Sequence, residues 1–278
     1  MFSKEKNLVR IAVLDLYEGQ PNEGMRCIHE ILDQYASERG LTIGQDIFDV
    51  RLKNQVPGMD YDIYISSGGP GSPLESEGSA WETTYFNWIT TVLDYNTQSA
   101  NKKKKHVLFI CHSFQLACRY FEIGVVTKRK STAFGVFPVH LLNEGKNASM
   151  FEGLKDPFFA VDSRNFQVIE PDHDRLESIG GSILAIEKER PHIPLERAVM
   201  ALRFNEYMSG TQFHPEADAT GMTTHLKNAD KKNMVIRDHG YEKWKSMIEQ
   251  LNDPDKIRWT YSHVIPNFLN NALFGAID

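Results

Sequence analysis

Short apolar runs alternate with segments of helical spacing through the first part of the chain, and this alternation limits the fold more than any other feature. Buried strands are indicated at residues 9–16, 47–52, 61–67 and 106–110. Helices are indicated over residues 25–35, with Gly40 as a stop, and over residues 80–95, whose aromatic face we expect to be core. This order predicts an α/β fold, with a mostly parallel sheet flanked by helices on both faces.

The second half of the chain becomes β-rich and then helical. One strand is expected within residues 133–142, and shorter ones at 158–162, 166–170, 182–187, 197–204 and 209–213. Beyond Glu216 the pattern is mostly helical and ends in the apolar segment VIPNFLNNALF. We therefore expect one domain over residues 1–278, with a C-terminal helical elaboration at about 217–278.

Composition excludes several classes of function. The net charge of −6 gives no electrostatic reason to expect a nucleic acid or an anionic membrane as partner. No apolar run is long enough to span a bilayer, and the amino-terminal segment lacks the apolar core of a signal peptide. Three cysteines are too few for a disulfide framework or a thiolate zinc site, so we expect a cytoplasmic protein without a metal.

The stretch FICHSFQLACRYF, residues 109–121, joins an apolar strand to a helical pattern at Cys111. A nucleophile on such a strand-to-helix turn is exposed above the sheet, and the following backbone N–H is free to donate. The positive end of the helix also favours a thiolate. The alternative is an ordinary core residue, because free cysteines are among the most buried side chains.

Two further motifs carry polar chemistry. In SGTQFHPEAD, residues 209–218, His214 and Glu216 stand two apart at a strand end, so both can point to one side and the carboxylate can orient the imidazole. In SSGGPGSP, residues 66–73, glycines after a strand can aim N–H groups at a developing negative charge. The alternatives are a structural histidine and a plain tight turn. Nucleotide binding is disfavoured, since the loop lacks the lysine of a phosphate-binding loop.

Together these motifs resemble the class I (triad) glutamine amidotransferases, a family of flavodoxin-like architecture. The resemblance covers roughly residues 9–216 and the last helix. It rests on a Gly-Gly-Pro loop, a Cys-x-x-x-Gln elbow and a Gln-Phe-His-Pro-Glu strand end, which here are Gly68, Gly69, Pro70, Cys111, Gln115, Gln212, Phe213, His214, Pro215 and Glu216.

The resemblance implies glutaminase-type amide hydrolysis through a cysteine thioester. Cys111 would be the nucleophile, with His214 as base and acid and Glu216 as its orienting carboxylate. The backbone N–H groups of Gly69 and His112 would form the oxyanion hole. Gly68 and Gln115 would help to bind the substrate, which is glutamine or another small amide. A separate synthetase would accept the ammonia, and no cofactor is implied.

The chain departs from the family pattern at the elbow. Phe109 and Ser113 replace two family glycines, so Phe109 requires a locally different packing, whereas serine is small enough to fit. We expect Phe114 to alter the wall of the substrate pocket. Arg164 is a candidate for binding a substrate carboxylate, with a surface position as the alternative.

Two other functions remain open on the same fold. Homoserine O-acyltransferases of the succinyltransferase type share the Cys, His and Glu triad, a stretch like Phe134 to Phe137 and a Ser-Arg pair like Ser163-Arg164. In that family the thioester is made from an acyl-coenzyme A and passed to a hydroxyl group. The third reading is a regulatory module without turnover, against which the retained triad argues.

Overall fold

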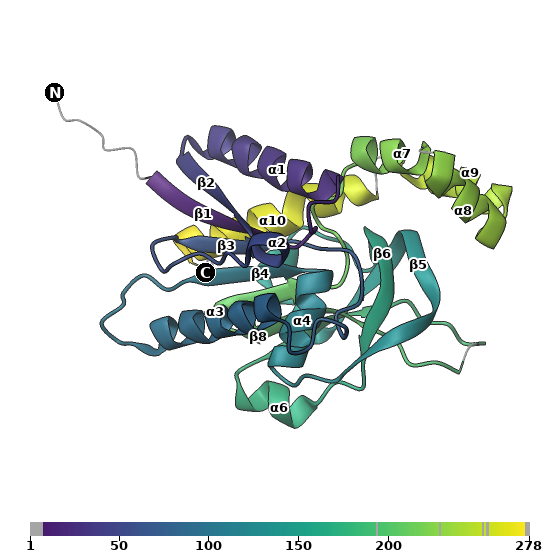
Figure 1. Cartoon of the computed structure of the whole chain (residues 1–278). Coiled ribbons are helices and arrows are strands. Elements are labelled where there is room, and N and C mark those ends of the chain that lie inside the picture. Colours follow the sequence, from purple (N-terminus) through teal and green to yellow (C-terminus); the bar gives the residue numbers. More distant parts are fainter. Residues whose placement is uncertain (1–7, 193, 228, 252, 254–255, 276–278) are drawn as a thin grey trace.

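The computed structural model describes residues 8–192, 194–227, 229–251, 253 and 256–275. A nine-stranded sheet runs through it in the order β2-β1-β3-β4-β9-β8-β7-β5-β6 (Figure 1). The strands are β1 Leu8–Asp15, β2 Thr42–Asp49, β3 Ile63–Ser66, β4 His106–Ile110, β5 Val125–Leu141, β6 Phe158–Ile169, β7 Ser182–Glu187, β8 Val199–Asn205 and β9 Met208–Thr211.

Helices fill most of the remaining described chain. They are α1 Glu23–Arg39, α2 Val50–Lys53, α3 Ala80–Thr97, α4 His112–Tyr120, α5 Asn143–Lys146, α6 His173–Ser178, α7 Ala219–Lys227, α8 Ala229–His239, α9 Tyr241–Leu251 and α10 Ile257–Phe274, with a short 3₁₀ turn, η1, at Ser149–Phe151. Gly40 ends α1 in the left-handed conformation, as expected, with φ of 63°.

The sheet is mixed, so the expectation of a mostly parallel sheet is wrong. Strands β2, β1, β3, β4 and β9 pair in parallel, whereas every pair from β9 through β8, β7 and β5 to β6 is antiparallel. A parallel pair needs a crossover of about a dozen residues or more. Only residues 206–207 separate β8 from β9, which permits a hairpin and no crossover.

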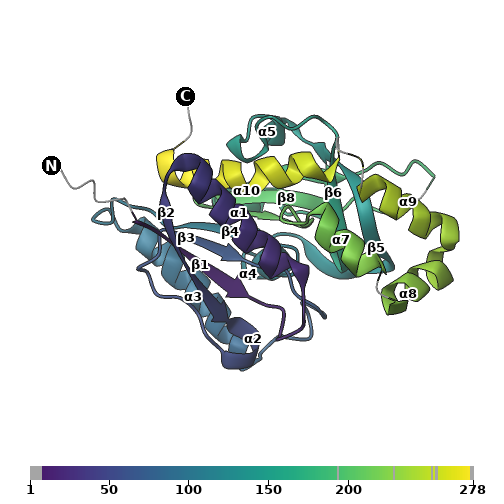
Figure 2. The same cartoon turned by 90° about the horizontal axis from the view of Figure 1, so that it is seen from above.

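Helices cover both faces of the parallel part, as the sequence predicts (Figure 2). On one face α1 and α10 pack against Ile11, Val13 and Ile65; on the other, α3 and α4 pack against Leu14 and Tyr64. The aromatic face of α3 is core, with Tyr85 and Trp88 almost fully buried. Helices α7 to α9 instead lie beside β5 and β6 and form a third apolar cluster with them.

Several strand boundaries differ from the sequence expectation. Strand β2 begins at Thr42 where 47 was expected, and β5 begins at Val125 where 133 was expected. The strand expected at 47–52 ends at Asp49, because the Asp49 carboxylate accepts a hydrogen bond from Leu52 N at 3.0 Å and begins helix α2. The two short strands expected at 158–162 and 166–170 are one long strand, β6, which pairs with β5 along most of its length.

A glycine on the neighbouring strand accommodates Phe109 at the end of β4. Phe109 is fully buried, with its ring edge-to-face against Phe204 at a centroid separation of 5.7 Å. Its partner across the β4–β9 pair is Gly210. A Cβ on Gly210 would lie 2.8 Å from a ring carbon of Phe114 and 3.2 Å from Cβ of Phe109. The absence of a side chain at Gly210 therefore leaves room for Phe109 and Phe114 at the elbow.

We predict that Gly210→Ala lowers the free energy of unfolding by about 2 kcal/mol, the usual cost of overpacking a core. Urea unfolding measures the change. Gly44→Ala is the matched control, because a Cβ there makes only ordinary contacts, the nearest at 3.7 Å. A Gly210→Ala protein as stable as the parent would contradict this packing.

Candidate active site

Cys111 stands on a strained turn between β4 and α4. Its backbone has φ of 49° and ψ of −96°, a combination that residues other than glycine rarely adopt. The Cys111 amide donates to Thr211 O at 2.8 Å, and its carbonyl accepts from Gln115 N at 3.1 Å. The turn is thus anchored to β9 on one side and to the first turn of α4 on the other, as a nucleophile elbow requires.

Ser113 fits at the second of the two elbow positions where the chain departs from the glycine pattern. Its side chain links the elbow to the sheet. Its hydroxyl donates to Ser66 O at 2.8 Å and accepts from Ile110 N at 2.8 Å. These bonds tie the start of α4 to the ends of β3 and β4. A glycine could make neither bond, so the serine takes part in the elbow rather than being merely tolerated there.

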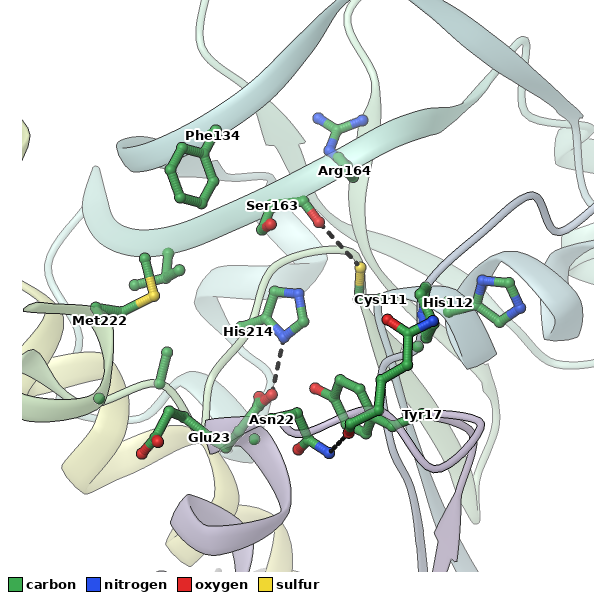
Figure 3. Close-up of a pocket in the computed structure, with 18 of the residues that line it drawn as sticks. Tyr17, Asn22, Glu23, Cys111, His112, Phe134, Ser163, Arg164, His214 and Met222 are labelled. Atoms are coloured by element: carbon green, nitrogen blue, oxygen red, sulfur yellow. Dashed lines mark hydrogen bonds and ion pairs between the residues drawn. The ribbon is translucent and has the colours of Figure 1, made fainter. Parts of the chain in front are cut away.

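Partly exposed His214 and buried Glu216 form a pair that faces Cys111. Nδ1 of His214 lies 2.8 Å from Oε1 of Glu216, whose side chain is 1% exposed. The backbone N–H of His214 donates to Val161 O on β6 at 2.8 Å, which fixes the strand end. In Figure 3 the other ring nitrogen points toward Cys111. This is the geometry that an imidazole needs to exchange a proton with the thiol.

Charge around His214 favours its protonated form. Burial alone lowers the pKa of an imidazole, but the negative charges of Cys111 and Glu216 outweigh it and raise the pKa of His214 well above its ordinary value. The opposite holds for His112, where burial and then the positive charges of Arg51 and Arg119 lower the pKa to about 3. The His112 side chain is therefore neutral at physiological pH.

The glycine loop lies against the same residues. A Cβ on Gly68 would lie 2.9 Å from Cε1 of His214, and a Cβ on Gly69 would lie 2.5 Å from Leu16 O. At either position, any residue larger than glycine would therefore force neighbouring atoms to move. Gly69 and His112 line a cavity beside Cys111, whereas Gly68 lies beneath the imidazole ring.

Gln115 reaches the site through a second glutamine. Its Nε2 donates to Oε1 of Gln212 at 3.1 Å, and Nε2 of Gln212 lies 3.9 Å from Sγ of Cys111. Both glutamines are buried, and Gln115 also lines the cavity. The amide nitrogen of Gln115 is therefore already hydrogen-bonded to Gln212.

Two sequence expectations about this site are wrong. Phe114 does not wall the cavity; it is fully buried in the core against Phe204, on the sheet side of α4. Arg164 is neither exposed nor available to a carboxylate. Its side chain is 1% exposed, its Nε donates to both carboxylate oxygens of Asp162 at 2.8 and 2.9 Å, and Glu187 lies 3.6 Å away.

The cavity has a volume of about 460 Å³ and includes residues that sequence reasoning missed. Tyr17, Asn22, Glu23 and Cys27 come from the β1–α1 connection and the start of α1. Met222 and Val235 come from α7 and α8, and Phe134 from β5; Figure 3 shows most of these around the thiol.

One feature of the sequence indicates the residues that come from the β1–α1 connection and the start of α1. Gly24 lies where a Cβ would be 2.3 Å from the Tyr17 hydroxyl, so the second glycine of YEGQPNEG marks the close approach of α1 to Tyr17.

Among the described residues, none of the helices combines the length and the apolar character needed to span a bilayer. Within the same ranges, no group of three or more His, Cys, Asp or Glu side chains could hold a metal ion.

Comparisons with known proteins assign the family. The family "Glutamine amidotransferase class-I" matches residues 25–232, so this chain belongs to the class I glutamine amidotransferases. A glutamine amidotransferase from Thermotoga maritima has a similar fold, with a TM-score of 0.66 at 15% identity over 96% of this chain and 98% of that one. The CTPS glutaminase domain from Trypanosoma brucei with bound acivicin has a TM-score of 0.53 at 14% identity, over 75% of this chain and 86% of that one.

A curated relative matches part of the chain. A homoserine O-acetyltransferase from Shouchella clausii is 29% identical over 127 residues, which are 45% of this chain and 38% of that protein. The matching part of the chain thus spans well under half the length of this relative.

We predict that Glu216→Gln shifts the titration of His214 to lower pH. The Glu216 carboxylate raises the pKa of His214, and a neutral amide removes that contribution while burial still opposes the charge. Cys111→Ser should shift the titration in the same direction, since it removes the other negative charge.

NMR of ¹⁵N-labelled imidazole groups measures the midpoint, with His214→Asn identifying the signal. An unchanged midpoint in both variants would show that neither group acts on His214.

Proposed function

We propose that this protein hydrolyses the side-chain amide of glutamine, or of a related small molecule, through a thioester on Cys111. The observation that carries the proposal is the strained Cys111 elbow facing the His214–Glu216 pair across one cavity. Family membership and the fold of a glutaminase domain support it. The three cysteines are free, which suits a reducing compartment such as the cytoplasm.

The reaction begins with attack of the Cys111 sulfur on the amide carbonyl. The backbone N–H groups of Gly69 and His112, which line the cavity, stabilise the oxyanion. His214 is held protonated by Cys111 and Glu216 and gives its proton to the departing nitrogen. Ammonia leaves, and the thioester remains on Cys111.

Water then completes the cycle. His214, neutral after giving up its proton, takes a proton from water, which attacks the thioester carbonyl. The carboxylic acid is released and Cys111 regains its charge beside the imidazolium. Glu216 orients the ring through the 2.8 Å bond to Nδ1. None of these steps needs a cofactor, and a separate synthetase would use the ammonia.

Acyl transfer is the second candidate, and the homoserine O-acetyltransferase relative favours it. The same Cys111 thioester would then form from an acyl donor and pass to a hydroxyl group. Both functions require an activated Cys111, and they differ in the acyl group that the cavity accepts.

We predict that 6-diazo-5-oxo-norleucine, a glutamine-like alkylating agent, adds once to the protein and that Cys111→Ser abolishes the adduct. Turnover should fall by at least about 10³-fold in Cys111→Ala, as expected for loss of a nucleophile. Intact-protein mass spectrometry and an ammonia assay measure the two effects. Cys118→Ala is the control, because Cys118 is fully buried in the core and does not line the cavity.

An adduct that survives Cys111→Ser would contradict the proposal. If no adduct forms while a small general thiol reagent labels Cys111 rapidly, the pocket takes another acyl group and acyl transfer becomes the better assignment.

A further inference from the structure

The cavity extends past His214, to the side where a leaving group departs. In a thiol-dependent cleavage the imidazole protonates the departing nitrogen, so substituents on that nitrogen lie on the imidazole's side of the sulfur. In Figure 3, Phe134, Met222 and Glu23 lie beyond His214 as seen from Cys111, and all three line the cavity. Ammonia needs about 30 Å³, the share of a water molecule. The cavity as a whole, at about 460 Å³, has far more room than ammonia needs.

An apolar wall covers part of this region. Phe134 on β5, Val161 on β6, Met222 on α7 and Val235 on α8 line the cavity and belong to one apolar cluster. Helices α7 and α8 thus contribute apolar side chains where ammonia alone would need none. A leaving group with an alkyl chain would bury that chain here.

An acidic cluster lies at the same end. Arg26 donates to Glu23 at 2.6 Å, to Glu30 at 2.7 Å and to Asp218 at 2.9 Å. Three carboxylates share one guanidinium, so the cluster keeps a net charge of −2. Glu23 and Asp218 line the cavity, and Arg26 does not. The cavity therefore attracts a positive charge.

Two independent observations show that the cavity suits a cation better than an anion. Oε2 of Glu216 is buried without a hydrogen-bond partner among the described residues, although Glu216 lines the cavity and is 1% exposed. Arg164 is the one arginine or lysine among the described lining residues, and Asp162 and Glu187 already bind it. The one other cationic side chain that lines the cavity is the His214 imidazolium, which Cys111 and Glu216 already hold. A substrate carboxylate therefore finds no uncommitted cationic side chain among the described lining residues, whereas an ammonium group finds acceptors.

We propose that the leaving group is an organic amine, with an alkyl chain on the Phe134–Met222–Val235 wall and a second, positively charged amine bound by Glu23 and Asp218. This inference rests on the proposed thioester chemistry. The sulfur of Cys111 bonds to the carbonyl carbon as the carbon–nitrogen bond breaks, and the amine leaves with a proton from His214. Water then cleaves the thioester and restores the thiol.

The test uses three amines with a four-carbon chain that differ in the group at the far end, which is positive, neutral or negative: 1,4-diaminobutane, butylamine and 4-aminobutanoate. Each is added while iodoacetamide alkylates Cys111, and intact-protein mass spectrometry gives the rate. We expect 1,4-diaminobutane to slow alkylation about tenfold at a concentration where butylamine slows it little and 4-aminobutanoate does not. Glu23→Gln should abolish the difference between the first two amines.

Glu30→Gln is the matched control, because Glu30 also binds Arg26 but does not line the cavity. It should preserve the difference between the amines. Equal protection by all three amines, no protection by any, or a difference that survives Glu23→Gln would each overturn the inference.

The proposed function is tested separately in the same series. If Cys111 resists iodoacetamide without any amine, the activated thiol itself is wrong, and the inference falls with it. If Cys111 reacts and glutamine is hydrolysed, but γ-glutamyl amides of butylamine and 1,4-diaminobutane are not, only the inference is wrong.

Discussion

The backbone of Cys111 is the constraint on which the rest of the site depends. A positive φ at a residue with a side chain costs about 1–3 kcal/mol, and it persists only where the surroundings enforce it. Here β4 is held between β3 and β9, the Cys111 amide is bound to Thr211 O, and Ser113 ties the start of α4 to Ser66. These contacts hold the sulfur above the carboxyl ends of the parallel strands.

The antiparallel half of the sheet places His214 and part of the cavity wall beside the elbow. Strand β9 is parallel to β4 and antiparallel to β8, so the chain that follows it brings His214 beside Cys111. Strand β6 then fixes His214 through Val161 O, and β5 and β6 provide part of the cavity wall. Helices α7 and α8 follow Glu216 closely in sequence, and their side chains Met222 and Val235 line the cavity.

Local patterns predicted much of this from the sequence. The β4–α4 junction, the His-Pro-Glu strand end and the glycine loop each have a short sequence signature, and the structure brings all three to one cavity. The roles of Cys111, His214, Glu216, Gly69, His112, Gly68 and Gln115 stay predictions. The proposed experiments test Cys111 and the His214–Glu216 pair. The mixed sheet was missed, because an apolar run does not reveal the direction of its neighbour.

Long-range packing explains the remaining errors. Phe114 has no local signal that places it on the core side of α4; the space beside Gly210, almost a hundred residues later, decides its position. Arg164 pairs with a carboxylate two residues away, and only burial shows that this pair is closed to a substrate. Glu23 and Asp218 are far apart in sequence, and both bind Arg26 in the folded chain.

The central claim is that Cys111 carries the acyl group during turnover. Its most direct test is acid quenching during the reaction with glutamine, followed by intact-protein and peptide mass spectrometry. The account predicts a transient adduct on Cys111 with the mass of glutamine less ammonia, which hydroxylamine removes. Ammonia release without any adduct on Cys111, or an adduct on another residue, would contradict it.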